Sequence, residues 1–229
     1  DNGVTIQHGR RQHASLSSDR YRHYVENIVS RLAIHYGNNP TVIGWQIDNE
    51  PGHYGVVDYS ENAQAKFRIW LQKKYGTIDK LNDTWGASFW SETYQNFEQV
   101  RLPNQQEVPD KANPHAMLDL NRFMADELAG FVNMQADILR RHIHKDQWIT
   151  TNLIPIFNPV DPVRIDHPDF LTYTRYLVTG HNQGIGSQGF RMGIPEDLGF
   201  SNDQFRNRVG KAFGVMELQP GQVNWGVYN

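Results

Sequence analysis

Apolar residues recur at three- and four-residue steps in three stretches of the chain, which is the spacing of one buried helix face. This pattern predicts helices over about 18–36, 60–75 and 117–143. The buried stripe expected on the first helix comprises Tyr21, Tyr24, Val25, Ile28, Val29 and Leu32. Gly37 and Gly76 follow the first two helices, and glycine commonly ends a helix because it tolerates the left-handed conformation.

Short apolar runs alternate with these helices along the chain. They lie at 41–47, 148–152, 170–174 and 212–216, and their length and polar flanks indicate buried strands. Strands that alternate with helices predict βαβ units and a parallel sheet. Residues 77–116 are rich in aromatic residues and contain three prolines, so we expect a long loop with short helices there.

Four strands are too few for a complete doubly wound domain. The sequence also begins and ends outside any predicted helix or strand. The expected fold class is therefore α/β, a partial parallel barrel in which residues 1–229 belong to one domain with no second domain. Hydrophobic residues make up 38% of the 229 residues, which supplies a sizeable core and excludes a disordered chain.

Charge and composition exclude several classes of partner. The 25 acidic and 22 basic residues give a net charge of −3, so no basic excess favours nucleic acid. The sequence has no run of 18 apolar residues, so no membrane span is expected. Cysteine is absent, which removes thiolate metal sites. We expect a cytoplasmic protein, but because the sequence opens without Met, a periplasmic or secreted location stays open.

Two glutamates stand at the ends of predicted strands. Glu50 follows the run that begins at Gly44, and Glu217 follows the run that begins at Phe213. In a parallel barrel, catalytic groups collect at the carboxyl ends of the strands, and glycoside hydrolysis needs two carboxyl groups there. A glutamate after a strand is also often the first polar residue of a loop, so position alone leaves both readings open.

The sequence around these glutamates resembles glycoside hydrolase family 42, the β-galactosidases. The resemblance is carried by GWQIDNE at 44–50, LNDTWG at 81–86 with FWS at 89–91, and VMELQPGQVNW at 215–225. It implies a TIM (β/α)8 catalytic barrel, of which this chain would hold roughly strands four to seven with their helices. It also implies that Glu50 is the general acid/base and Glu217 the nucleophile.

The same resemblance implies a set of substrate-binding residues. Asn49 matches the residue that hydrogen-bonds the sugar 2-hydroxyl, and Trp225 matches a tryptophan that lines the galactose site. Arg11 lies where the family carries an arginine beside the nucleophile, although Arg10 and Arg11 could equally be solvated loop charges. Tyr176 is the best match to a tyrosine after strand six.

Trp90 resembles a tryptophan that closes the pocket of an adjacent subunit in trimeric members, so a homo-oligomer, a trimer, is the expected assembly. Plain packing among the surrounding aromatic residues is an equally good reading of Trp90. Many members carry a cysteine cluster for zinc, but Ser15 stands where its first cysteine would be. No metal and no cofactor are therefore expected.

The expected function is retaining hydrolysis of terminal, non-reducing β-D-galactose residues from oligosaccharides by two glutamates. One alternative is a related barrel glycosidase that acts on β-galactan-type polysaccharides, which would use the same two glutamates. Another is a carbohydrate-binding relative that kept the fold and lost turnover. Residues 184–189 fit the dinucleotide pattern G-x-G-x-x-G, but the polar residues before it and the proline after it do not form the required strand and helix.

Overall fold

The computed structural model of the chain describes residues 13–52, 57–104, 113–154, 160–175, 195–210 and 212–218. Its elements follow in the order α1 (Asp19–Tyr36), β1 (Gly44–Gln46), α2 (Glu61–Tyr75), α3 (Ile78–Trp85), η1 (Phe89–Ser91), η2 (Phe97–Gln99), α4 (Pro114–Arg140), β2 (Trp148–Thr150), β3 (Asn152–Leu153), η3 (Pro162–Arg164), β4 (Leu171–Arg175), α5 (Pro195–Val209) and β5 (Phe213–Leu218). The alternation of helices and strands predicted from the sequence is confirmed.

Polar side chains fix where the helices begin. Ser18 caps α1 and Ser60 caps α2, each accepting a hydrogen bond from the backbone N–H three residues on. Asn113 caps α4 in the same way, and Pro114 takes the first helical position. Proline suits that position because it needs no N–H partner there. The predicted start of this helix at residue 117 was therefore too late.

The strands are all parallel to their neighbours within the described residues. β1 pairs with β2, and β3, β4 and β5 form a second ladder in that order. β2 and β3 are separated by Thr151, whose carbonyl oxygen still accepts a hydrogen bond from Thr172 N at 3.0 Å. The predicted strand 148–152 is thus one extended segment with a local interruption. Parallel strands in chain order, alternating with helices, fit a TIM-barrel-like fold.

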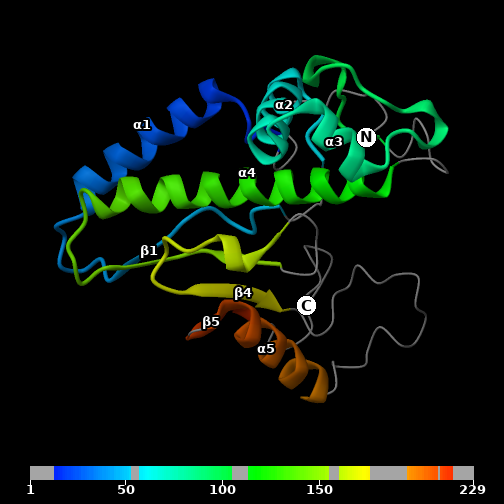
Figure 1. Cartoon of the computed structure of the whole chain (residues 1–229). Helices are drawn as coiled ribbons and strands as arrows, with labels where there is room; N and C mark the ends of the chain where they lie inside the picture. The colour runs from blue at the N-terminus through cyan, green and yellow to red at the C-terminus, as the bar shows by residue number, and fades with distance from the viewer. Residues whose placement is uncertain are drawn as a thin grey trace, which may run out of the picture.

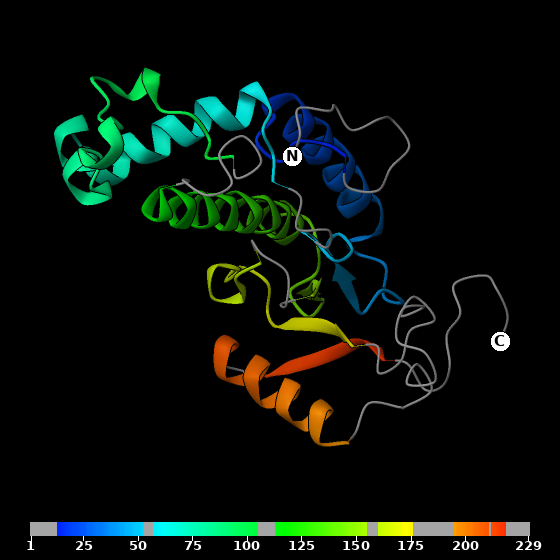
Figure 2. The same cartoon turned by 90° about the vertical axis from the view of Figure 1, so that its right-hand side faces the viewer.

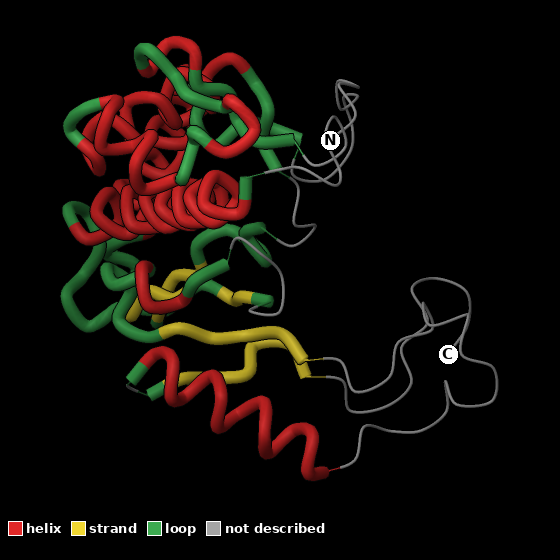
Figure 3. Tube along the Cα trace, turned by 45° about the vertical axis from the view of Figure 1, so that its right-hand side comes forward, coloured by secondary structure: helices red, strands yellow, loops and turns green. Residues whose placement is uncertain are grey.

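α4 lies between the other N-terminal helices and the strands (Figure 1). α1, α2 and α3 lie on one side of it and the strands on the other, and α5 covers β4 and β5 from the far side (Figure 2). Figure 3 shows the same layering from an intermediate angle. The strands are consequently flanked by helices, as the predicted βαβ units require.

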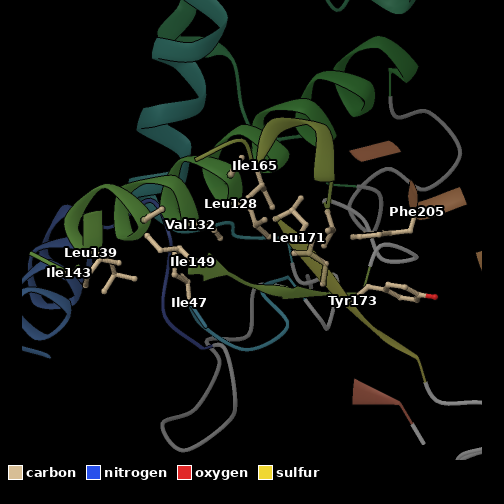
Figure 4. Close-up of a cluster of buried hydrophobic side chains, with 14 of the residues drawn as sticks. Ile47, Leu128, Val132, Leu139, Ile143, Ile149, Ile165, Leu171, Tyr173 and Phe205 are labelled. Atoms are coloured by element: carbon tan, nitrogen blue, oxygen red, sulfur yellow. The ribbon is translucent and has the colours of Figure 1, made fainter. Parts of the chain in front are cut away.

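The larger core fills the space between α4 and the strands (Figure 4). Ile149 and Leu153 are fully buried in it, and Leu128 and Val132 of α4 pack in the same cluster. Each such side chain contributes roughly 1.5–3 kcal/mol on burial. Because side chains alternate along a strand, Asn152 faces the other side, away from α4.

A second core joins α2, α3 and the first half of α4. Phe67, Leu71 and Phe123 are almost fully buried there. The segment between α2 and α4 contains α3, η1 and η2. The predicted loop with short helices over 77–116 is therefore confirmed in outline.

Two parts of the sequence-based fold prediction were wrong. On α1, Tyr24, Ile28 and Leu32 are 57%, 54% and 43% exposed, because α1 packs on α4 through the adjacent face that carries Val29 and Ala33. The helix α5 was not predicted at all. Its sequence lacks a continuous apolar stripe, and its buried side is anchored chiefly by Phe205.

Candidate active site

Glu50 lies in a tight turn just after β1. Asp48 and Glu50 have φ angles of 52° and 48°, a left-handed conformation that costs a non-glycine residue roughly 1–3 kcal/mol. The backbone N–H of Glu50 donates to Asn152 Oδ1 at 3.1 Å, which helps to hold this turn. Glu50 is only 6% exposed, so the turn places a carboxyl group inside the protein.

Glu217 reaches the same region through a register shift in β5. Tyr173 pairs with Val215, but Thr174 pairs with Glu217, so one residue of β5 is skipped. Phe213 and Val215 pack against the core, and simple alternation would send Glu217 the same way. The shift instead turns Glu217 to the face that carries Thr174. Bulges commonly re-aim a side chain in this manner.

Asn152, at the start of β3, connects the two glutamates. Its Nδ2 donates to Glu217 Oε1 at 2.8 Å, to Asn49 Oδ1 at 3.1 Å and to Thr174 Oγ1 at 3.1 Å. Its Oδ1 accepts hydrogen bonds from Glu50 N at 3.1 Å and from Gln46 Nε2 at 2.9 Å. The asparagine is fully buried. Residues from β1, β3, β4 and β5 therefore meet around one amide.

The carboxyl group of Asp48 interacts with residues that Asn152 does not contact. Desolvation by the surrounding protein raises the pKa of its carboxyl group, although hydrogen bonds from the Asn49 backbone and from Gln135 of α4 act to lower it. Burial also raises the pKa of the Tyr21 hydroxyl on α1, and the charge of Asp48 adds to that shift. Asp48 thus interacts with the α1 and α4 side of the turn, while Asn49 and Glu50 interact with Asn152.

The structure brings three of the predicted site residues together, namely Asn49, Glu50 and Glu217. Arg11, Tyr176 and Trp225 lie outside the described residues. Trp90 belongs to η1, but its side chain also lies outside what is described. The roles assigned to these residues remain predictions.

Three residues of the cluster were not predicted from the sequence, namely Gln46, Asn152 and Thr174. A usable signal existed for Asn152, which ends the run of residues predicted as a strand. Carboxyl ends of neighbouring parallel strands meet at one end of a barrel. The position of Asn152 at the end of a predicted strand therefore indicates a site residue on the same grounds as the two glutamates.

No group of three or more histidine, aspartate and glutamate residues within the described ranges is arranged to hold a metal ion. Ser15, at the position considered for a zinc ligand, donates a hydrogen bond to Asp58. None of the helices in the described part of the chain is both long enough and apolar enough to cross a bilayer.

The cluster contains two glutamates at the carboxyl ends of parallel strands, and one buried amide contacts the backbone N–H of Glu50 and the carboxylate of Glu217. Such a pair can supply a proton to a leaving oxygen and a nucleophile to a sugar carbon. Fold and site together are those expected of a barrel glycoside hydrolase.

Comparison with known proteins names the family. The model of glycoside hydrolase family 42, described as β-galactosidase, matches residues 1–229. The chain belongs to this family. It is 37% identical to β-galactosidase BgaA of Thermus sp. over 96% of the chain and 35% of that protein. It is 34% identical to β-galactosidase Bga of Halorubrum lacusprofundi over 97% of the chain and 32% of that protein.

Solved structures agree with this assignment. The β-galactosidase from the Antarctic haloarchaeon Halorubrum lacusprofundi matches with a TM-score of 0.87 and 32% identity, over 99% of this chain and 34% of that one. An agarase matches with a TM-score of 0.52 and 18% identity, a likeness that shows the fold alone. The chain spans about a third of the length of the curated relatives that it matches.

Proposed function

We propose that this chain carries the catalytic pair of a retaining β-galactosidase that removes terminal, non-reducing β-D-galactose from oligosaccharides. Membership of glycoside hydrolase family 42 supports the substrate class. The observation that carries the proposal is the hydrogen-bond network in which one amide contacts both Glu50 N and Glu217 Oε1. Two strand-end glutamates joined in this way suit a double displacement.

In the proposed reaction, Glu217 attacks the anomeric carbon while Glu50 donates its proton to the departing glycosidic oxygen. The galactosyl group is then linked covalently to Glu217. Glu50, now ionised, removes a proton from water, and that water displaces Glu217 from the opposite face. The two inversions retain the β configuration. For this mechanism, the two carboxyl groups should lie about 5–5.5 Å apart.

The remaining predicted residues would bind the sugar. Asn49 would hydrogen-bond the 2-hydroxyl, a contact that strengthens as positive charge develops on the ring. Arg11 would lie beside Glu217. Trp225 would offer a flat apolar face to the C–H side of galactose, and Tyr176 would complete the pocket wall.

Assembly and barrel position complete the proposal. The described strands would be strands four to seven of an eight-stranded barrel, which puts Glu50 on strand four and Glu217 on strand seven. Trp90 would close the pocket of an adjacent subunit in a homotrimer. Sedimentation of the full-length protein, with and without Trp90→Ala, tests the assembly separately from the chemistry.

Azide rescue tests the two roles in the full-length protein. Glu217→Ala should abolish hydrolysis of a nitrophenyl β-galactoside, and azide should restore turnover with α-galactosyl azide as the product. Glu50→Ala with an activated leaving group should give β-galactosyl azide instead. Glu98→Ala, at an exposed position, serves as the control and should behave like the wild type. Exchanged anomers would reverse the two roles, and absence of rescue in both variants would contradict the catalytic pair.

A further inference from the structure

We propose that Asn152 is a positioning residue, which holds the backbone of Glu50, the side chain of Asn49 and the carboxylate of Glu217 in one fixed arrangement. The proposal rests on the function proposed above, because it concerns how that site is built. Asn152 is assigned neither the nucleophilic attack nor a proton transfer, although its Nδ2 donates a hydrogen bond to the Glu217 carboxylate. It acts through the three residues that would contact the sugar.

The partners of Asn152 fix the orientation of its amide. A backbone N–H such as that of Glu50 can only donate a hydrogen bond, so it must face Oδ1. An ionised carboxylate such as that of Glu217 can only accept, so it must face Nδ2. The observed contacts at 3.1 Å and 2.8 Å follow this arrangement. If the amide were flipped, Nδ2 would face the Glu50 N–H, donor against donor, and Oδ1 would face the Glu217 carboxylate, acceptor against acceptor.

This arrangement explains why the position needs asparagine. The side chain must present an acceptor to β1 and a donor to β5 from a fully buried position. Aspartate would keep the acceptor and lose the donor, and an apolar residue would lose both. Oδ1 has two lone pairs and two partners, Gln46 and Glu50. The two Nδ2 protons serve three acceptors, so the hydrogen-bonding capacity of the amide is fully used.

The consequences for the reaction differ on the two sides of the amide. The hydrogen bond to Glu217 holds one carboxylate oxygen in place, which fixes the orientation of the group that attacks. The hydrogen bond from Glu50 N supports the left-handed turn and so sets where the proton donor lies. Among the described residues, the titratable residues hydrogen-bonded to the amide are Glu50 after β1 and Glu217 on β5. The facing position on β4 contributes the Thr174 hydroxyl.

The test compares substitutions at two buried positions on the same face of one segment, measured in the full-length protein. Asn152→Ala should lower kcat about 10- to 100-fold, the loss expected when a charged group loses one hydrogen bond, with little change in KM. Asn152→Asp should lower kcat further and move the acid limb of the pH–rate profile to higher pH, because a second carboxylate faces Glu217. Thr150→Val is the matched control, since Thr150 is equally buried and lies two residues earlier. It should keep the wild-type kcat and pH profile.

A substitution at Gln46 keeps the test decisive if the two Asn152 variants do not fold. Gln46→Met removes one hydrogen bond to Asn152 Oδ1 at a position exposed enough to tolerate it. It should lower kcat less than Asn152→Ala does and leave the thermal transition unchanged. Wild-type kcat and pH profile in every folded Asn152 and Gln46 variant would overturn the positioning role.

The substrate preference of the wild-type protein distinguishes failure of this proposal from failure of the proposed function. Rates are measured on nitrophenyl β-galactoside, β-glucoside, β-mannoside and β-fucoside. If the wild type prefers another sugar while Asn152→Asp still shifts the acid limb, the galactosidase proposal fails and the positioning role stands. If the wild type hydrolyses the galactoside and the variants match it, the function stands and the positioning role fails. Absence of turnover on every glycoside would overturn both.

Discussion

The indole ring of Trp148 lies against the backbone of Gly44. The two residues pair in register between β1 and β2, and a Cβ atom built on Gly44 would lie 2.1 Å from Cδ2 of Trp148. The ring also packs on Phe170, with 5.5 Å between the ring centroids. β1, which leads to Glu50, can therefore pair with β2 in this register only because residue 44 has no side chain.

Gly44→Ala should destabilise the protein. The added methyl group must displace a packed ring, which typically costs about 1–3 kcal/mol, and thermal unfolding measures the loss. Gly130→Ala in α4 is the matched control, because a Cβ there meets nothing within 4 Å. It should stabilise by about 0.5–1 kcal/mol through helix propensity. Equal effects of the two substitutions would contradict the close packing at Gly44.

The helix α5 is anchored by one aromatic residue. Phe205 is 1% exposed and contacts the rings of Tyr173 and Phe213 at centroid distances of 4.9 and 5.6 Å. Phe205→Ala should cost about 3–5 kcal/mol of stability. Phe200→Ala on the same helix, at a site 62% exposed, should change stability by less than about 0.5 kcal/mol. A large loss in both variants would mean that α5 packs by another face.

Asp119 is a buried carboxylate in the second core, between α2, α3 and α4. It accepts hydrogen bonds from Lys74 Nζ, from Tyr75 OH at 2.5 Å and from Trp85 Nε1 at 3.1 Å. Burial alone would raise the pKa of Asp119, but these hydrogen bonds outweigh burial and hold the pKa below its usual 3.8. The ionised form is therefore the one that the folded state stabilises.

This depressed pKa predicts how stability depends on pH. The contribution of Asp119 is fully present above about pH 4, where the unfolded state is also ionised, and is lost as the pH falls through the lower pKa of the folded state. Asp119→Asn should cost roughly 1–3 kcal/mol near neutral pH, because it removes the charged acceptor of several hydrogen bonds to partly buried donors.

The same substitution should flatten the acid dependence of stability, measured by thermal unfolding from neutral pH down to about pH 2. Asp19→Asn is the control. Asp19 pairs with Lys66 at 2.8 Å on the surface, so its removal should have a far smaller effect. An unchanged acid dependence in Asp119→Asn would contradict the assigned role.

Much of the fold follows from short-range sequence signals. The apolar periodicity of residues 18–36 and 60–75 and the apolar runs at 41–47 and 148–152 predict helices and strands where the structure has them. Periodicity could not show which face of α1 packs, because apolar residues cover two adjacent faces. α5 was missed because its packing depends mainly on one anchor, Phe205, and not on a repeated pattern.

The site was predicted in part. Strand position and motif resemblance pointed to Asn49, Glu50 and Glu217, and the structure brings them to one amide. The register shift that turns Glu217 to that face depends on pairing between β4 and β5. Such long-range pairing leaves no local mark in the sequence, and the role of Asn152 follows from the same pairing.

Asn49 gives a prediction that isolates one contact with the substrate. Asn49→Ala should lower kcat/KM for a nitrophenyl β-galactoside by at least about 100-fold, because 2-hydroxyl contacts supply several kcal/mol at the transition state. With the 2-deoxygalactoside, which lacks that hydroxyl, wild type and variant should react at similar rates. An equal loss on both substrates would assign Asn49 to the structure of the site and not to the 2-hydroxyl.

The central claim is that Glu217 forms a covalent bond to galactose. The most direct test incubates the full-length protein with 2-deoxy-2-fluoro-β-galactosyl fluoride, which slows release of the galactosyl group, and then locates the label by peptide mass spectrometry. The account predicts one 2-fluorogalactosyl group on Glu217, and no label in Glu217→Gln. A label on another carboxylate, or inactivation without any covalent adduct, would contradict it.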